Sequence, residues 1–243
     1  MQKEFINTAA HELRTPIQPI LGISNILNKN LKDDKQKELL DVIVRNARRL
    51  KKLSEDVLDV SKIESNLLNL NKEHFAIKEL IQNIINNYKN ELQKKSINIT
   101  FMVSDDFFIY ADKIRISQVI SNLISNSIKF SSDEKEEGKI SIIVKKKTIY
   151  KNNSDSVISS DCSNSHMVVI MIKDNGIGID EETLPGLFTK FTTTSFQGIG
   201  LGLFISKNII EAHGGRIWAE NNKDGDQDAT FSFSLPIDSY KNN

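Results

Sequence analysis

A seven-residue apolar repeat in the first 65 residues constrains the fold of this chain more than any other feature. The first stretch of the repeat places apolar side chains at Ile6, Ala10, Leu13, Ile17, Ile20 and Leu27. The second stretch places its repeat at Leu40, Ile43, Ala47, Leu50, Ser54 and Val57. This spacing predicts two helices that pack along a left-handed seam. The polar residues 28–35 between them predict a short connection, and therefore an antiparallel helical hairpin.

A single hairpin cannot enclose a core, because each of its helices buries only one face. Two copies that form a four-helix bundle can, so the repeat predicts a homodimer through this segment. A polar junction over residues 64–73 then separates the hairpin from a part of the sequence with a different residue pattern. We therefore expect two domains, residues 1–66 and residues 67–243.

The second domain mixes helical and strand patterns. Helices are expected around residues 80–92, 113–130 and 200–213, and Asp112 is suited to cap the second of them. Strands are expected at residues 97–103, 107–110, 139–150, 167–172, 215–220 and 229–235. The run 167–172 is apolar without alternation, which is typical of a strand buried on both faces. The fold class expected is an α/β sandwich with helices on one face of the sheet, preceded by the helical bundle.

Charge and cysteine content limit the classes of function that this chain can have. The chain carries 32 Lys and Arg against 32 Asp and Glu, so no overall field attracts nucleic acid or an anionic membrane. Cys162 is the only cysteine and cannot form an internal disulfide, and we interpret it and His166 as loop residues without metal-ligand spacing. No apolar run is long enough to span a bilayer. These features predict a soluble cytoplasmic fragment without direct membrane contact, whose parent protein could still be membrane-anchored.

The first candidate for chemistry is His11, which falls opposite the apolar seam and therefore faces solvent. A lone exposed histidine is usually inert. Here Glu12 can accept a hydrogen bond from one imidazole nitrogen and leave the other as a nucleophile. Thr15 lies one helical turn away on the same face, where its hydroxyl could orient a water molecule.

A second candidate is an asparagine pair in the helix expected at 113–130. Asn122 and Asn126 are four residues apart and share one face, with Lys129 and Phe130 following one turn later. Asparagine is a poor residue inside a helix, so a pair on one stripe suggests a polar site beside a core, although two solvated amides would explain it equally well. Amide oxygens together with phosphate oxygens and water suit Mg²⁺.

Two glycine-bearing stretches could approach a ligand. Asp174, Gly176 and Gly178 directly follow the apolar strand, where a carboxylate could accept from the amino group of adenine, although such a sequence is also an ordinary turn. Glycines 198, 200 and 202 open the helix expected at 200–213, whose exposed N–H groups suit phosphate oxygens. Between them, Phe188 and Phe191 could anchor a lid over residues 192–195, and ordinary core packing of the two rings is an equal and compatible interpretation.

These stretches, in this order, resemble the motif boxes of two-component sensor histidine kinases. Residues 11–16 resemble the phosphoacceptor box, 122–130 the N box, 174–178 and 198–202 the two glycine boxes, and 188–191 the F box. Residues 212–218 also match the segment that usually follows the second glycine box in this family, which makes His213 a structural residue at a helix end. The family resemblance implies a dimeric phosphoacceptor hairpin followed by a Bergerat-type ATP-binding domain. Because the chain starts ten residues before His11, it resembles an excised catalytic core.

The same resemblance implies a role for each site residue. His11 would attack the γ-phosphate of ATP with Glu12 polarising it, and Thr15 would assist dephosphorylation of a partner's phospho-aspartate. Asn126 would bind Mg²⁺, and Asn122 and Lys129 would contact phosphates. Asp174 would bind adenine. The remaining cofactor-binding positions would be Phe130, Gly176, Gly178, Gly198, Gly200 and Gly202.

The activity implied is ATP-dependent autophosphorylation on His11 and phosphoryl transfer to an aspartate of a response-regulator receiver domain, with phosphatase activity on that aspartate as a further expectation. The alternative is a non-catalytic nucleotide-binding signalling scaffold, which would bind ATP without transferring phosphate. A nucleic-acid binder using the stripe of Arg45, Arg48, Arg49 and Lys52 is disfavoured, because acidic residues follow at pairing distance on the same helix.

Overall fold

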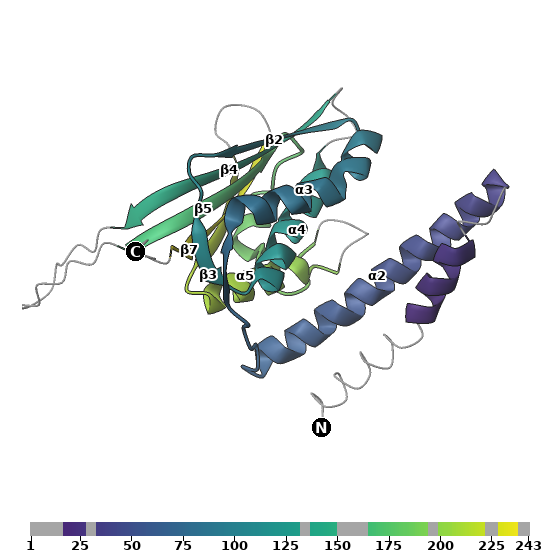
Figure 1. Ribbon diagram of the computed structural model, residues 1–243, viewed down its shortest axis with the longest axis horizontal. Coiled ribbons are helices and arrows are strands. Elements are labelled where there is room, and N and C mark those ends of the chain that lie inside the picture. Colours follow the sequence, from purple (N-terminus) through teal and green to yellow (C-terminus); the bar gives the residue numbers. More distant parts are fainter. Residues whose placement is uncertain are drawn as a thin grey trace, which may run out of the picture. The chain divides into compact units, whose positions relative to one another are not determined.

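The computed structural model describes residues 17–27, 33–131, 137–149, 165–193, 199–221 and 228–237 (Figure 1). The chain divides into two compact units. One comprises residues 1–68 with 195–201, and the other comprises residues 69–194 with 202–243. The domain boundary expected at residues 66 and 67 stays a prediction.

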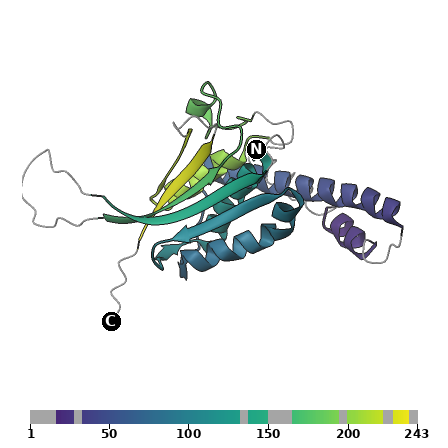
Figure 2. The same ribbon diagram turned by 90° about the horizontal axis from the view of Figure 1, so that it is seen from above.

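The first unit contains a helix over residues 17–27 and the long helix α2 (Asp34–Glu64). The side chain of Asp33 caps α2 by accepting a hydrogen bond of 2.9 Å from the N–H of Lys35. Figures 1 and 2 show the short helix beside the N-terminal half of α2. The two expected helices are thus confirmed over the described residues.

The apolar repeat of this unit is only half buried. Leu40, Ala47 and Ser54 are buried on α2, and Ile17 is buried on the preceding helix. Four other positions of the repeat, Ile20, Leu27, Ile43 and Leu50, are between 40% and 49% exposed. A single chain therefore leaves an apolar stripe open, as the repeat predicts.

The second unit is built on a five-stranded sheet with the strand order β2–β4–β5–β7–β6 (Figure 1). Its strands are β2 (Ile97–Val103), β4 (Gly138–Ile149), β5 (Ser165–Asp174), β6 (Arg216–Asn221) and β7 (Ala229–Pro236). The β2–β4 pair is parallel and the other pairs are antiparallel. A separate two-stranded antiparallel sheet joins β1 (Glu73–Ala76) to β3 (Phe108–Ala111).

Three helices cover one face of the large sheet (Figure 2): α3 (Ile77–Lys94), α4 (Lys113–Phe130) and α5 (Gly202–Ala212). The burial of β4 identifies the covered face, because Ile140, Ile142 and Val144 are buried while the alternate residues 141 and 143 are not. The core between the layers consists of fully buried apolar side chains, among them Ile81, Ile116, Ile120, Leu123, Ile172 and Phe233. This arrangement confirms the expected α/β sandwich.

Asp112 and His213 tie the start of α4 to the end of α5. The Asp112 carboxylate accepts hydrogen bonds from the N–H groups of Arg115 (3.0 Å) and Asn71 (2.9 Å), which confirms the predicted cap. The N–H of Asp112 donates to Nε2 of His213 over 2.9 Å, while Nδ1 of that buried ring donates to the Ile209 carbonyl over 2.8 Å. Nε2 can accept this bond only when it carries no proton, so the ring is neutral with its proton on Nδ1, and burial lowers the pKa of His213.

The structure corrects three local predictions. His166 lies in β5 rather than in a loop, with its Nδ1 3.3 Å from the Thr148 hydroxyl, and Cys162 lies outside the described residues. Strand β1 was not predicted, because its four residues show no clear alternation. Within the run 167–172, Met171 is partly exposed, so only residues 167–170 form a stretch that is buried on both faces. Among the described residues, no helix combines the length and apolarity needed to cross a bilayer.

Candidate nucleotide-binding site

The asparagine face of α4 packs against the start of α5. Nδ2 of Asn122 donates to the Ser206 hydroxyl over 3.0 Å, and that hydroxyl donates to the Gly202 carbonyl over 2.8 Å. A Cβ atom added to Gly202 would collide with Oδ1 of Asn122, so a larger residue would require the Asn122 amide to move from its present position. The structure therefore brings Asn122 and Gly202, 80 residues apart in sequence, into direct contact.

Asn126 lies one turn further along the same face and is partly buried. Its amide makes no hydrogen bond with the described residues, so its oxygen is not committed to another group within them. Lys129 follows, with its ammonium 5.1 Å from the centre of the Phe130 ring. A free amide oxygen beside a cationic side chain suits a hydrated Mg²⁺ ion bound to phosphates.

Asp174 is the last residue of β5 and is only 2% exposed. Its Oδ2 accepts a hydrogen bond of 2.8 Å from the Ser127 hydroxyl on α4, and its Oδ1 accepts one of 3.1 Å from the Gly176 N–H. Burial raises the pKa of Asp174 to about 6, against the lowering effect of these two bonds, and the neighbouring charge of Asp228 raises it further. The carboxyl group is thus held in place, but its two hydrogen bonds do not offset the cost of burying the ionised form.

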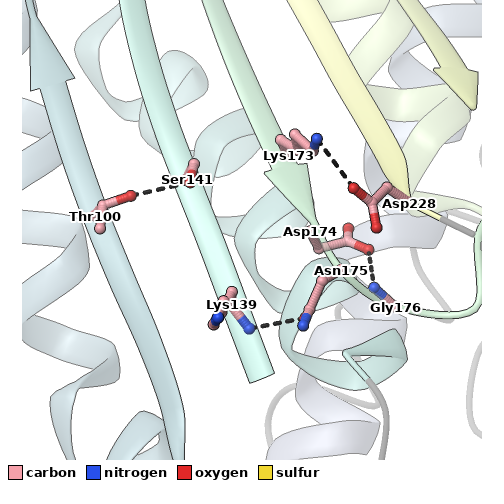
Figure 3. Close-up of polar contacts among 8 residues, drawn as sticks. All are labelled: Thr100, Lys139, Ser141, Lys173, Asp174, Asn175, Gly176 and Asp228. Carbon is pink, nitrogen blue, oxygen red and sulfur yellow. Dashed lines mark hydrogen bonds and ion pairs between the residues drawn. The ribbon is translucent and has the colours of Figure 1, made fainter. Parts of the chain in front are cut away.

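The loop after β5 is anchored on both sides. The Asn175 side chain accepts from the Lys139 N–H over 2.8 Å, and Figure 3 shows this bond beside the Asp174–Gly176 bond. A Cβ atom on Gly176 would collide with the Phe130 carbonyl at the end of α4. Gly178 has a φ angle of 75°, in the left-handed region that favours glycine.

Asn221, at the end of β6, holds the next part of this loop. Its amide accepts from the N–H of Ile179 over 2.8 Å and donates to the carbonyl of the same residue over 2.6 Å. Paired amide bonds of this kind fix both the position and the orientation of the loop backbone.

The segment between the two glycine stretches is described as far as Thr193. Phe191 is 68% exposed and has a φ angle of 64°, so ordinary core packing is wrong for this residue. Phe188 is partly buried, and the Lys190 ammonium lies 5.2 Å from the centre of the Phe204 ring on α5. One aromatic side chain of this stretch is therefore available to a ligand or a neighbouring segment.

The structure brings the α4 residues, Asp174, Gly176 and Gly202 together in the second unit. Gly200 has a φ angle of 73° and belongs to the segment grouped with the first unit. Two polar contributors to the site, Ser127 and Asn221, were not predicted from the sequence. Ser127 carried a visible signal, because it is a polar residue in register with the apolar positions of α4, whereas nothing in the sequence marked Asn221. His11, Glu12, Thr15 and Gly198 lie outside the described residues.

Comparison with known families gives two matches. Residues 111–239 match the family of histidine kinase-, DNA gyrase B- and HSP90-like ATPases, which is about half of the chain. Residues 1–66 match the His Kinase A phospho-acceptor domain.

Curated relatives align with almost the whole chain. Histidine kinase 5 of Arabidopsis thaliana is 31% identical over 96% of this chain and 26% of its own length. The autoinducer 2 sensor kinase/phosphatase LuxQ of Vibrio parahaemolyticus is 28% identical over 96% of this chain and 26% of its own length. The chain thus spans about a quarter of the length of these relatives.

Solved structures of similar fold include full-length ShkA in complex with AMPPNP, with a TM-score of 0.71 and 25% identity over 96% of this chain and 46% of that chain. Histidine kinase ThkA in complex with the response regulator TrrA gives a TM-score of 0.58 and 28% identity over 96% of this chain and 61% of that chain. Together with the family matches and the geometry above, these likenesses lead to one conclusion: the chain belongs to the histidine kinases, as a phospho-acceptor region joined to an ATPase domain.

Proposed function

We propose that this chain binds ATP, phosphorylates itself on His11 and passes the phosphoryl group to an aspartate of a response-regulator receiver domain. The likeness to ShkA solved with AMPPNP supports the nucleotide, and the likeness to ThkA solved with a response regulator supports the partner. The likeness to LuxQ, a sensor kinase/phosphatase, supports phosphatase activity on the same aspartate.

The observation that carries this proposal is the buried carboxylate of Asp174, held beside the asparagine face of α4. Its oxygens already accept from Ser127 and Gly176, and the 6-amino group of adenine would supply a further donor. Asn122 and Lys129 would then contact the phosphates. Glycines 176, 178, 198, 200 and 202 would let the backbone approach the nucleotide closely.

Asn126 is the residue proposed to hold Mg²⁺, together with phosphate oxygens and water. The fit rests on its partly buried amide, which makes no hydrogen bond with the described residues. When bound, the ion would neutralise negative charge on the phosphates during transfer. The helix-end N–H groups of α5 and the Lys129 ammonium would act on the same charge.

In the transfer step, an imidazole nitrogen of His11 forms a bond to the γ-phosphorus while the bond from that phosphorus to the ADP oxygen breaks. Glu12 accepts a hydrogen bond from the second imidazole nitrogen and so stabilises the positive charge that develops on the ring. The phosphoryl group then moves from His11 to a carboxylate oxygen of the receiver aspartate. Thr15 would orient the water that later hydrolyses the phospho-aspartate.

Dimerisation through the hairpin, residues 1–66, is part of the proposal. The exposed seam positions Ile20, Leu27, Ile43 and Leu50 lie on the face that a second copy would cover. Residues 67–243 would form the ATP-binding domain of each copy.

The test is incubation with γ-labelled ATP and Mg²⁺. We expect acid-labile label on the wild-type chain and none on His11→Gln, because glutamine offers no nucleophilic nitrogen. His74→Gln is the matched control, since His74 is an exposed histidine on β1 and should leave labelling unchanged. An unlabelled wild type, or equal labelling of His11→Gln, would contradict the proposal. ATP binding without label transfer would instead favour the signalling scaffold.

A further inference from the structure

A charged pair lies beside Asp174 and is not used by the function proposed above. Lys173 precedes Asp174 on β5 and points to the opposite face of the sheet, where its Nζ lies 3.0 Å from Oδ2 of Asp228 (Figure 3). Asp228 directly precedes β7, and the first residue of that strand, Ala229, is in register with Asp174. The two carboxyl groups therefore sit at the same end of the sheet, one on β5 and the other directly before β7.

The two members of this pair are buried to different extents. The side chain of Asp228 is 12% exposed, whereas that of Lys173 is 44% exposed. A carboxylate this deeply buried is unfavourable unless it is paired with a cation. Lys173 supplies that cation from the solvent side, at a distance typical of a charge-assisted hydrogen bond.

Asp228 is the negatively charged group that acts on Asp174 among the described residues. Among the described residues, α4 contributes the Ser127 hydroxyl and, further on, the Lys129 ammonium above the Phe130 ring. The loop contributes the Gly176 N–H, and β4 contributes Lys139, whose main-chain N–H is bound to Asn175. The charge of Asp228 raises the pKa of Asp174, in the same direction as burial.

We propose that Lys173 and Asp228 are positioning residues for adenine recognition. Lys173 draws the Asp228 carboxylate toward the outer face of the sheet and neutralises it, so that Asp174 stays ionised and aimed at the 6-amino group. The pair also ties the end of β5 to the start of β7, which fixes the strand end that carries Asp174. This inference rests on the proposed function, because it takes Asp174 as the adenine acceptor.

The test measures ATP affinity from pH 5 to pH 8 by calorimetry for the wild-type chain, Lys173→Met, Asp228→Asn and the double variant. For the wild type we expect an affinity midpoint near pH 6, the pKa of Asp174. Lys173→Met leaves Asp228 unpaired, so the midpoint should rise by about half a unit to one unit, and binding at pH 6.5 should weaken about two- to five-fold. The partial exposure of Lys173 means that high salt should reduce this shift.

Asp228→Asn removes the neighbouring charge and should lower the midpoint, and the double variant should return it to the wild-type value or below. Lys145→Met is the matched control, because Lys145 is an exposed lysine on the same sheet and makes no ion pair with the described residues. Its profile should overlay that of the wild type.

Three results would overturn the inference. An unchanged profile for both Lys173→Met and Asp228→Asn would mean that the pair has no part in recognition. A loss of affinity by the same factor at every pH would mean a purely structural role. A wild-type chain that binds no ATP at any pH would overturn the proposed function, and this inference with it, whereas the first two results leave the proposed function intact.

Discussion

At the scale of single residues, the burial of Asp174 connects stability to ligand binding. Its carboxyl is only 2% exposed and accepts hydrogen bonds from Ser127 and Gly176, yet its pKa is raised to about 6. The ionised form is therefore less stable in the folded chain than in the unfolded chain, where the pKa is 3.8. A bound adenine amino group would add the donor that this carboxylate lacks.

Replacing Asp174 by Asn should make the ATP-binding domain more stable and its nucleotide affinity weaker. Because the folded pKa lies above the unfolded one, the contribution of Asp174 is fully favourable below pH 3.8 and is lost as the pH rises through about 6. The neutral amide avoids that loss, so we expect a gain of about 1–3 kcal/mol at pH 7 and little difference at pH 4. ATP affinity should fall about ten-fold or more, since a charged acceptor is replaced by a neutral one.

Thermal unfolding at the two pH values and calorimetric titration with ATP measure both effects. Asp105→Asn is the control, because Asp105 is an exposed carboxylate and should change neither quantity. A variant that is destabilised at pH 7 would show that the two hydrogen bonds outweigh the burial of the charge.

At the scale of elements, the site depends on close contacts between α4 and two glycine positions. Gly202 lies against the Asn122 amide and Gly176 against the Phe130 carbonyl, so α4 fixes both the start of α5 and the loop after β5. Along α4, Asn122 lies beside the start of α5, and Ser127, nearer the end of α4, binds the Asp174 carboxylate. Helix packing therefore sets the relative positions of the groups proposed to bind the phosphates and the adenine.

Gly202→Ala should disturb this arrangement selectively. The new Cβ would collide with the Asn122 amide, which must move away from Ser206, and overpacking of this kind costs about 1–3 kcal/mol. We expect a lower melting temperature and an ATP affinity reduced about ten-fold or more, measured by calorimetry. Gly186→Ala is the matched control, because its Cβ would meet only the Thr189 hydroxyl, at an ordinary contact distance of 3.8 Å. Equal behaviour of the two variants would contradict the packing argument.

Element types were readable from the sequence, but several boundaries were not. The cap at Asp112 and the helix to Phe130 were predicted because a side-chain acceptor and an apolar period mark them locally. Strand β1 and the extension of β5 back to Ser165 were missed, because both are stabilised by pairing with distant strands rather than by their own pattern.

At the scale of the whole molecule, the chain combines an α/β domain that closes its own core with a hairpin that does not. The sandwich buries its apolar side chains between the sheet and three helices. The hairpin leaves Ile43 and Leu50 of α2 49% and 40% exposed, at positions of its seven-residue repeat. An apolar stripe with this repeat is typical of a face that packs against further helices.

Ile43→Glu combined with Leu50→Glu should therefore convert the chain from a dimer to a monomer. Four carboxylates would face each other in the bundle, and their burial and repulsion should weaken dimerisation at least 100-fold. Light scattering after size-exclusion chromatography measures the mass, and ATP affinity should stay unchanged because neither residue of α2 belongs to the proposed ATP site. Leu39→Glu is the control, since Leu39 is 68% exposed and lies off the repeat. A wild-type monomer would contradict the proposed bundle.

The amino-acid sequence by itself determined the helical repeat, the types of most elements of the sandwich and a set of candidate site residues. Each depends on local physics: an apolar period, a helix cap, a poor helix former on a polar stripe, or a glycine before a helix. The order of the motif boxes then led to the family, which the family matches confirm.

Only the tertiary structure decided which polar groups surround Asp174 and hence how readily it ionises. Ser127 reaches it from α4 and Asp228 from the position before β7, and their sequence separation from Asp174 hides this proximity. The physical reason is that a pKa depends on burial and on through-space neighbours, and both arise only when the sheet and its helices have assembled.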